Sequence, residues 1–299
     1  MRPRTTAITS VGFILASVSL CAAQTAGPPE LRAARVKVAP AIDGSPDDAA
    51  WKEAAELRLD AECRGGPNKG KKTPVTLRAA VDDQNVYFLL RWRDATEDKT
   101  HKSYVWNDER QAYESGKDRE DNAALSFPIK GKFTANMLSG EDELWDVWHW
   151  KAFRTGPAGY AMDRTHMYSA TKPDGKAKEF DAANGKKVWI ARPEDKGESV
   201  TKERPAPKDK QASPPPHYEA EKPSDSAADI QTGHSYKDGW WTVEFARKLD
   251  TGYADDARFI ADGTYAMGVA VFDRSEHDFH YTAGPLKLRL DEDVSSKGP

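Results

Sequence analysis

The sequence contains little cysteine, no surplus of positive charge and few long apolar runs. Cys21 and Cys63 are the two cysteines among 299 residues, and the first lies in a segment that we expect to be removed. An internal disulfide is therefore excluded in the mature chain. Lysine and arginine number 44 against 48 acidic residues, a balance that argues against nucleic-acid binding. Stability must come from an apolar core, a bound ligand, or both.

The N-terminal residues have the pattern of an export signal. Arg2 and Arg4 precede an uncharged run over residues 5–23 with an apolar centre. We expect residues 1–23 to be the signal peptide, and its removal leaves 48 acidic residues against 42 basic ones. Later apolar runs are too short to cross a bilayer. The mature chain is therefore expected to be soluble and exported, either periplasmic or secreted.

Short segments of alternating apolar and polar residues recur along the chain, whereas amphipathic helical stretches are scarce. The clearest pair is 75–81 and 86–92, joined by the turn Asp-Asp-Gln-Asn at 82–85. Similar segments lie at 123–129, 146–154, 240–246, 265–272 and 281–290. Many short strands without a βαβ rhythm predict an all-β fold, an antiparallel β-sandwich with short helical pieces.

Residues 192–229 differ in composition from the rest. They include seven prolines, dense mixed charge and almost no large aliphatic side chains. Such a segment cannot bury enough apolar surface to order itself. Because strand-like sequence resumes at Trp240, we expect a disordered insertion in a surface loop of a single domain over 30–290, followed by a polar tail at 291–299.

Motifs of known catalytic sites are missing from the sequence. It contains no GxSxG nucleophile turn, P-loop, HExxH zinc motif or dinucleotide-binding fingerprint. The acidic runs at 141–143 and 291–293 are typical of solvated surface.

Three segments carry a family resemblance. Residues 42–51, Ile-Asp-Gly-Ser-Pro-Asp-Asp-Ala-Ala-Trp, form a turn and a short helical piece that, taken alone, indicate a lid over one end of a sandwich. Residues 146–154 read Asp-Val-Trp-His-Trp-Lys-Ala-Phe-Arg, and residues 238–247 add Asp-Gly-Trp-Trp-Thr-Val-Glu-Phe-Ala-Arg. The first segment resembles the start of family 9 carbohydrate-binding modules and DOMON-type domains. All three together resemble the haem-binding domain of the ethylbenzene dehydrogenase gamma subunit and of cytochrome c-552 and DMSO reductase-like proteins.

The resemblance implies a sandwich of the family 9 and DOMON type that holds one b-type haem. Many relatives carry a cysteine-containing haem c motif, which this chain lacks, so the haem would be non-covalent. The strand at 146–154 supplies suitable groups: Trp148 and His149 for the porphyrin, Lys151 and Arg154 for its propionates. A plainer interpretation remains open, with the tryptophans in the core and His149 and Lys151 in solvent.

The C-terminal strand offers an axial ligand. From His280 an alternation runs to Leu286, Leu288 and Leu290, which predicts that the imidazole points inward with them. An inward imidazole needs a hydrogen-bond partner or a metal. The residues alone favour a core histidine, whereas the resemblance implies an iron ligand here and nominates His280, with His277 as the neighbouring alternative.

The resemblance also implies a methionine ligand upstream of the 146–154 strand. Met137, in a loop containing Gly and Ser, is the best placed, and Met162 is the runner-up. Ligation by His and Met would give six-coordinate, low-spin iron with a raised potential. Such a centre transfers electrons and leaves no open position for a substrate, so we expect no enzyme.

The family context implies a redox partner, either a c-type cytochrome or a molybdenum oxidoreductase. The rival hypothesis is a carbohydrate-binding module whose nine tryptophans build a platform for sugar rings. A third hypothesis is a structural domain without haem, in which His280 completes a hydrogen-bond network in the core.

Overall fold

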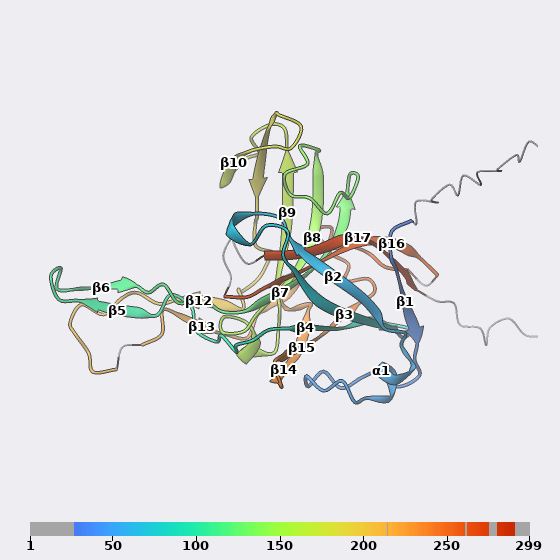
Figure 1. The fold of residues 1–299 in the computed structure, drawn as a ribbon, viewed down its shortest axis with the longest axis horizontal. Helices are drawn as coiled ribbons and strands as arrows, with labels where there is room; N and C mark the ends of the chain where they lie inside the picture. Colours follow the sequence, from blue (N-terminus) through green and yellow to red (C-terminus); the bar gives the residue numbers. More distant parts are fainter. Residues whose placement is uncertain (1–26, 214, 261, 275–279, 291–299) are drawn as a thin grey trace, which may run out of the picture.

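The structure is a computed structural model that describes residues 27–213, 215–260, 262–274 and 280–290. Its main body is one continuous sheet of 13 strands (Figure 1). The order along the sheet is β10 (Ala177–Asp181), β11 (Lys187–Ala191), β9 (Met162–Ser169), β8 (Glu143–Lys151), β7 (Asn122–Lys130), β16 (Thr264–Phe272), β17 (His280–Leu290), β1 (Glu30–Arg35), β3 (Lys72–Val81), β4 (Asn85–Arg93), β15 (Trp240–Lys248) and β14 (Gln231–Lys237). The thirteenth strand, β2 (Leu57–Cys63), pairs with β17 and β3.

The continuous sheet folds over so that its two halves pack face to face, which confirms the predicted all-β sandwich. Phe88 of β4 packs on Trp148 of β8, with ring centroids 5.7 Å apart, and Trp92 packs on Trp150 at 6.1 Å. Trp241 of β15 lies 5.1 Å from Trp150. Edge-to-face aromatic pairs add to the stabilisation that burial provides. The pairing is antiparallel except at β1, which runs parallel to both β17 and β3.

The segment at 42–51 contains α1 (Ala49–Glu53) and covers the outer face of β3, β4 and β15, where Trp51 clusters with Ala80 and Tyr87. The prediction that it closes one end of the sandwich is wrong, because these residues alternate along their strands with the residues of the core. Trp51 is fully buried, and its Nε1 donates to Glu244 of β15 at 2.6 Å. The backbone N–H groups of Asp43 and Gly44 donate to the other oxygen of Glu244. A Cβ at Gly44, where φ is +86°, would lie 2.3 Å from the backbone of residue 234, so the turn requires glycine. Two of the three segments that carry the family resemblance, 42–51 and 238–247, therefore meet at the carboxylate of Glu244.

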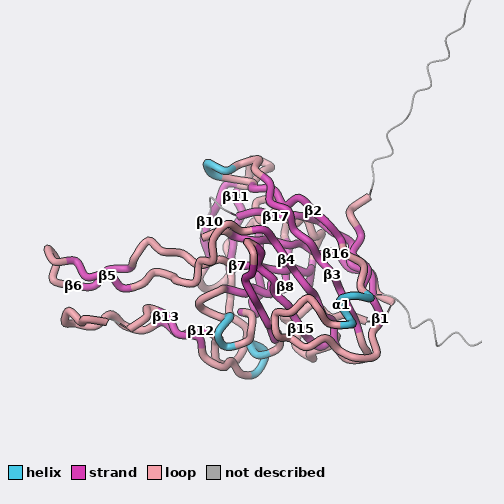
Figure 2. Tube along the Cα trace, turned by 60° about the horizontal axis from the view of Figure 1, so that its bottom comes forward, coloured by secondary structure: helices cyan, strands magenta, loops and turns pink. Residues whose placement is uncertain are grey.

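Two thin arms extend from the body side by side (Figures 1 and 2). One is the hairpin of β5 (Tyr104–Asn107) and β6 (Ala112–Ser115), and the other contains β12 (Thr201–Glu203) and β13 (Tyr218–Ala220). The prediction of disorder over 192–229 is wrong for the described part of this segment. Its order comes from a partner that composition does not reveal: the hydroxyl of Tyr104 donates to the carbonyl of Arg204, and Lys210 pairs with Asp108 at 2.9 Å.

The remaining helices are short 3₁₀ turns at Gly66–Asn68, Gly156–Ala158 and Asp225–Ala228. Within the described ranges, no helix is long and apolar enough to cross a membrane. The predicted signal peptide at 1–23 and the tail at 291–299 lie outside the described residues.

Candidate functional site

The outer face of one half of the sheet collects the chemically distinctive side chains. On β8, Lys151 and His149 alternate with the buried tryptophans, and Met162 of β9 stands directly across from His149. On the same face, Lys151 is aligned across β7 with Phe272 of β16, and Phe272 is aligned with His280 of β17. We call these five residues, His149, Lys151, Met162, Phe272 and His280, the histidine face.

Three rings of the histidine face form a stack. The rings of Phe272 and His280 are nearly parallel, 8° apart, with centroids at 4.2 Å. His149 stacks on Phe272 at 5.5 Å and 25°. A flat aromatic surface flanked by two imidazoles is therefore built from three separate strands.

His280 reaches this face for a reason that the sequence prediction missed. Tyr281 and Ala283 pack against the core, and after Pro285 so do Leu286 and Leu288. The cross-strand partners shift between Met267 and Val269, which marks a bulge opposite residues 284–285. The bulge resets the alternation, so the prediction that His280 shares the inward face of Leu286 is wrong. His280 instead lies on the outer face, across from Phe272.

Two side chains of the histidine face are polar and poorly satisfied. Nε2 of His149 is buried, with no hydrogen-bond partner among the described residues. Lys151 is 5% exposed, and its Nζ donates to Sδ of Met162 at 3.4 Å. Burial, with repulsion from Arg154 and Arg164, lowers the pKa of Lys151 well below its usual range. Burial likewise lowers the pKa of His149, so its imidazole is held neutral, the form that binds metals.

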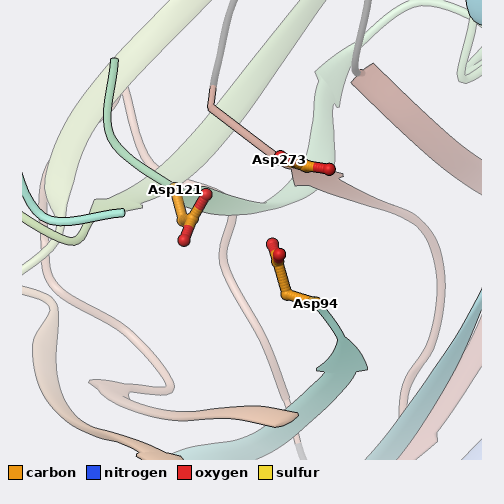
Figure 3. A group of neighbouring side chains, drawn as sticks. All are labelled: Asp94, Asp121 and Asp273. Carbon is orange, nitrogen blue, oxygen red and sulfur yellow. The ribbon is translucent and has the colours of Figure 1, made fainter. Parts of the chain in front are cut away.

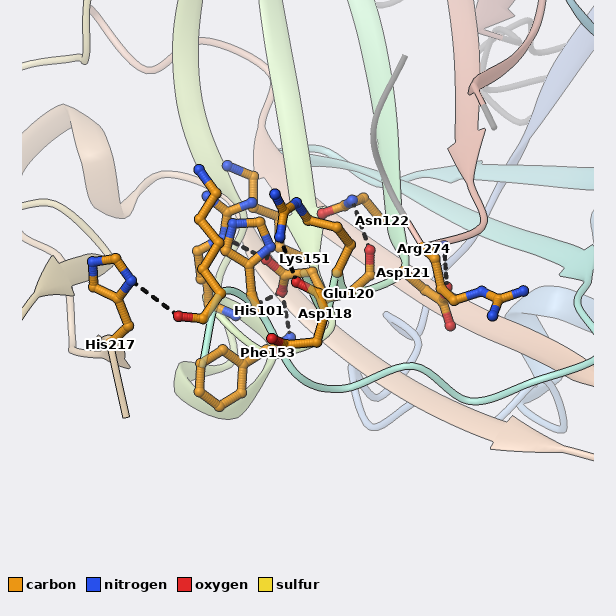
Figure 4. A network of polar contacts seen from close by, with 12 residues as sticks. His101, Asp118, Glu120, Asp121, Asn122, Lys151, Phe153, His217 and Arg274 are labelled. Atoms are coloured by element: carbon orange, nitrogen blue, oxygen red, sulfur yellow. Dashed lines mark hydrogen bonds and ion pairs between the residues drawn. The ribbon is translucent and has the colours of Figure 1, made fainter. Parts of the chain in front are cut away.

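Trp148 and Arg154 do not join this face. Trp148 is fully buried in the core between Phe88 and Arg247, so its predicted place beside His149 in one pocket is wrong. The period of two along a strand sends neighbours to opposite faces. Arg154 pairs with the buried carboxylate of Glu120, which also accepts from the backbone N–H of Phe153 (Figure 4). Arg154 is thus already neutralised and less suited to a propionate than Lys151.

Met137 lies at the side of the same half-sheet, half buried against a cluster that contains Trp145 and Phe272. Its Sδ accepts from Arg192 at 3.9 Å. Phe272 thus contacts the cluster around Met137 on one hand and the ring of His280 on the other. Of the two methionines that the sequence nominated, the runner-up Met162 is the one that lies on the histidine face itself. His277 lies outside the described residues.

An acidic group borders the histidine face where three strands end (Figure 3). Asp94 follows β4, Asp121 precedes β7 and Asp273 follows β16, and their carboxylate oxygens lie within 4.8 Å of one another. Asp121 accepts three N–H bonds, from Asp98, Trp241 and Arg274. Burial raises its pKa to about 7 and that of Asp94 to about 6. Because these donors come from separate loops, the group fixes the strand ends beside the face.

Sequence reasoning missed Phe272, Arg192 and Glu120. Phe272 had a usable signal, since it ends an apolar strand directly before Asp273. Arg192 begins the proline-rich segment and Glu120 lies in a charged turn. Neither had a signal, because their partners Met137 and Arg154 lie in loops 55 and 34 residues away along the chain.

The histidine face has the chemistry of a site for a flat, anionic, metal-bearing ligand. It offers the neutral imidazole of His149, the imidazole of His280 and a thioether as ligands, an aromatic ring for packing, and a buried lysine for a carboxylate. The buried Nε2 of His149 has no partner among the described residues, and the buried Nζ of Lys151 donates to a thioether, a weak acceptor. The chemistry of these residues fits a haem.

Comparison with known proteins gives one family match. The family model described as ethylbenzene dehydrogenase matches residues 48–282. A search of curated proteins gives no match. Similar solved structures include a carbohydrate-binding protein from Bacteroides uniformis described as putative, at 8% identity over 88% of this chain and 100% of that one, with a TM-score of 0.46.

A family 9 carbohydrate-binding module from Caldicellulosiruptor kristjanssonii, solved with glucose, is 9% identical over 90% of this chain and all of that one, with a TM-score of 0.38. The same module with cellotriose covers 90% of this chain and 97% of that one at 9% identity, with a TM-score of 0.40.

Proposed function

Because the chain belongs to the ethylbenzene dehydrogenase family, we propose that it binds one non-covalent b-type haem on the histidine face and serves as an electron-transfer protein or subunit. The observation that carries the proposal is the convergence of His149, Met162, Phe272 and His280 from four strands on one surface, beside a buried lysine. A haem with two protein ligands supplies a reversible one-electron couple.

The chain's own residues would divide the work of binding. His280 and Met137 remain the proposed axial ligands, with Met162 and His149 as the nearest competitors. Phe272 would pack against the porphyrin. Lys151 would regain its charge beside a propionate, since an anion reverses the effect of burial on its pKa. We propose export to the periplasm and a redox partner, either a c-type cytochrome or a molybdenum oxidoreductase, and no catalytic role for this chain alone.

The test is an absorption spectrum of the protein expressed with haem and exported, first oxidised and then reduced with dithionite. A Soret band with sharp reduced α and β bands is expected. His280→Ala should abolish the low-spin spectrum, whereas His149→Ala, a substitution of the same type on the same face, should leave the bands in place. Met137→Leu and Met162→Leu decide between the thioethers. A featureless visible region after haem reconstitution would rule out this function.

A second candidate function rests on a cavity over the other half of the sheet. It has a volume of about 610 Å³ and is bordered by Asp60, Arg91 and Trp240. The guanidinium of Arg91 lies 5.6 Å from the ring of Trp240. An aromatic ring beside charged hydrogen-bonding groups suits a sugar. The nine tryptophans form no common platform, because six are buried.

Glycan binding predicts a colourless protein that is retained on a polysaccharide column, with retention lost in Trp240→Ala. The haem function predicts a coloured protein whose spectrum Trp240→Ala leaves unchanged. The two functions use opposite halves of the sheet, so one variant separates them.

A further inference from the structure

A cluster of buried carboxylates lies behind the histidine face. Asp146 of β8, Asp163 of β9 and Asp256, in the loop after β15, place carboxylate oxygens within 4.8 Å of one another. The three residues are 0%, 3% and 6% exposed. Met162 and Asp163 are consecutive, so the strand that presents a thioether to the histidine face presents a carboxylate to this cluster. We call Asp146, Asp163 and Asp256 the buried acid cluster.

The carboxylate of Asp163 is the unexplained group. Neither of its oxygens receives a hydrogen bond from a described N–H group or hydroxyl, and the side chain that shares a hydrogen bond with it is another carboxyl group, that of Asp195. Oδ1 of Asp256 lies 3.7 Å from Arg247. In the acidic group of Figure 3, by contrast, Asp121 is held by three N–H donors. Buried carboxylates are paired or coordinate metals, because an unpaired buried charge is very costly.

The charge of the buried acid cluster does not balance. Its one described cation is Arg247, which pairs with Asp146 and lies 3.7 Å from Asp256. Arg247 Nη2 is committed to the carbonyl of Ala257. With all three carboxyls ionised, one guanidinium leaves two negative charges, whereas burial and the repulsion from Asp146 raise the pKa of Asp256 to about 7 and the pKa of Asp163 well above its usual range. Asp195, whose Oδ2 is also unmatched, adds a further carboxylate at the margin.

A small cavity reaches the cluster from the side of Asp195. It has a volume of about 10 Å³ and is bordered by Asp163, Glu194, Asp195 and Ser199. A space of this size holds about one water molecule or one ion. Ca²⁺ takes carboxylate oxygens in flexible geometries, whereas Mg²⁺ demands a near-ideal octahedron. Three carboxylates from two strands and a loop therefore suit Ca²⁺ better than Mg²⁺.

We propose that the buried acid cluster is a site for one Ca²⁺, held by Asp146, Asp163 and Asp256, that fixes β8 and β9 behind the histidine face. The ion supplies two positive charges, which allow the three carboxyls to ionise, and it gives Asp163 a cationic partner. The competing explanation is that the carboxyl groups share protons, with Asp163 and Asp195 as the pair.

The test compares thermal unfolding of the whole mature protein in EGTA and in CaCl₂, with MgCl₂ as a control. At a Ca²⁺ concentration of about 100 times Kd, Tm should rise by about 5–10 °C. In Asp163→Asn, which keeps the shape but removes the charge, Tm in EGTA should equal or exceed that of the wild type, and the response to Ca²⁺ should vanish. Asp174→Asn, at an exposed site, should respond like the wild type.

Terbium provides an independent readout, because Trp148 stands directly across from Asp163 in the β8–β9 pair. Tryptophan-sensitised Tb³⁺ emission should appear in the wild type, be displaced by Ca²⁺, and fall by one equivalent in Asp163→Asn. Equal Tm values for the wild type in EGTA and CaCl₂, with the same number of Ca²⁺ ions bound to wild type and Asp163→Asn, would overturn the proposal in favour of shared protons. Neither outcome depends on haem.

Discussion

Replacement of Lys151 by methionine should separate stability from haem binding. In the apoprotein the amino group of Lys151 is buried, and its Nζ donates to the thioether of Met162. Methionine fills a similar volume without a charge, so Lys151→Met should stabilise the apoprotein by about 1–3 kcal/mol. If Lys151 binds a propionate, loss of that charge-assisted hydrogen bond, about 1.5–3 kcal/mol, should weaken haem binding by about 10- to 150-fold.

The pH dependence of apoprotein stability provides a second test of the buried Lys151. Burial lowers the pKa of Lys151 in the folded chain. Between this lowered pKa and the ordinary lysine pKa, the unfolded chain therefore binds a proton that the folded chain has released. The stability of the wild-type apoprotein should therefore rise as pH increases toward the ordinary lysine pKa of about 10.4. Lys151→Met should lack this contribution.

Urea unfolding followed by circular dichroism measures the first quantity, and haem titration followed at the Soret band measures the second. Lys178→Met, at an exposed position of β10, is the matched control and should change neither. A less stable Lys151→Met apoprotein would show that the ammonium is well satisfied after all. Unchanged haem affinity would remove Lys151 from the binding site.

Two further substitutions test the structural frame by urea unfolding. Glu244→Gln should destabilise the protein by about 2–3 kcal/mol, because an amide cannot accept from all three N–H donors of the 42–51 segment. The exposed Glu53→Gln is the control and should stay within about 0.5 kcal/mol of wild type. An equally small effect at Glu244 would show that its carboxylate does not hold the 42–51 segment in place. Arg247→Met should cost about 3–5 kcal/mol, since it leaves Asp146 buried without its cation; a neutral effect would mean that Asp146 is protonated in the fold.

The architecture and the short helix after residue 42 were predictable because they depend on local signals. The alternation around residues 75–92 specified a hairpin that the structure contains as β3 and β4. The turn and helix at 42–51 were likewise predictable as local structure, whereas the surface that Trp51 covers, the outer face of β3, β4 and β15, was not. Such features are encoded within a few residues of each other, so one sequence is enough to read them.

The face of His280 was mispredicted because one irregularity reverses a period of two. Gly284-Pro285 interrupts β17, and proline in a strand is itself a bulge signal that the alternation count ignored. Arg192 and Glu120 were out of reach for a different reason. Their partners, Met137 and Arg154, lie in loops 55 and 34 residues away along the chain. The folded sheet brings these loops together, and no local sequence pattern displays that.

The parallel pairing of β1 has a consequence for how the molecule assembles. Glu30 is aligned with Lys287 and Ala33 with Ala79, so the first strand lies between the last strand and an early hairpin. The two halves of the sheet are joined along this seam by contacts between opposite ends of the chain. Contacts of such long range form slowly, because loop closure must precede them. The sandwich can therefore close only after the final strand has been synthesised, and a chain truncated before β17 would keep β1 and β16 as exposed edges.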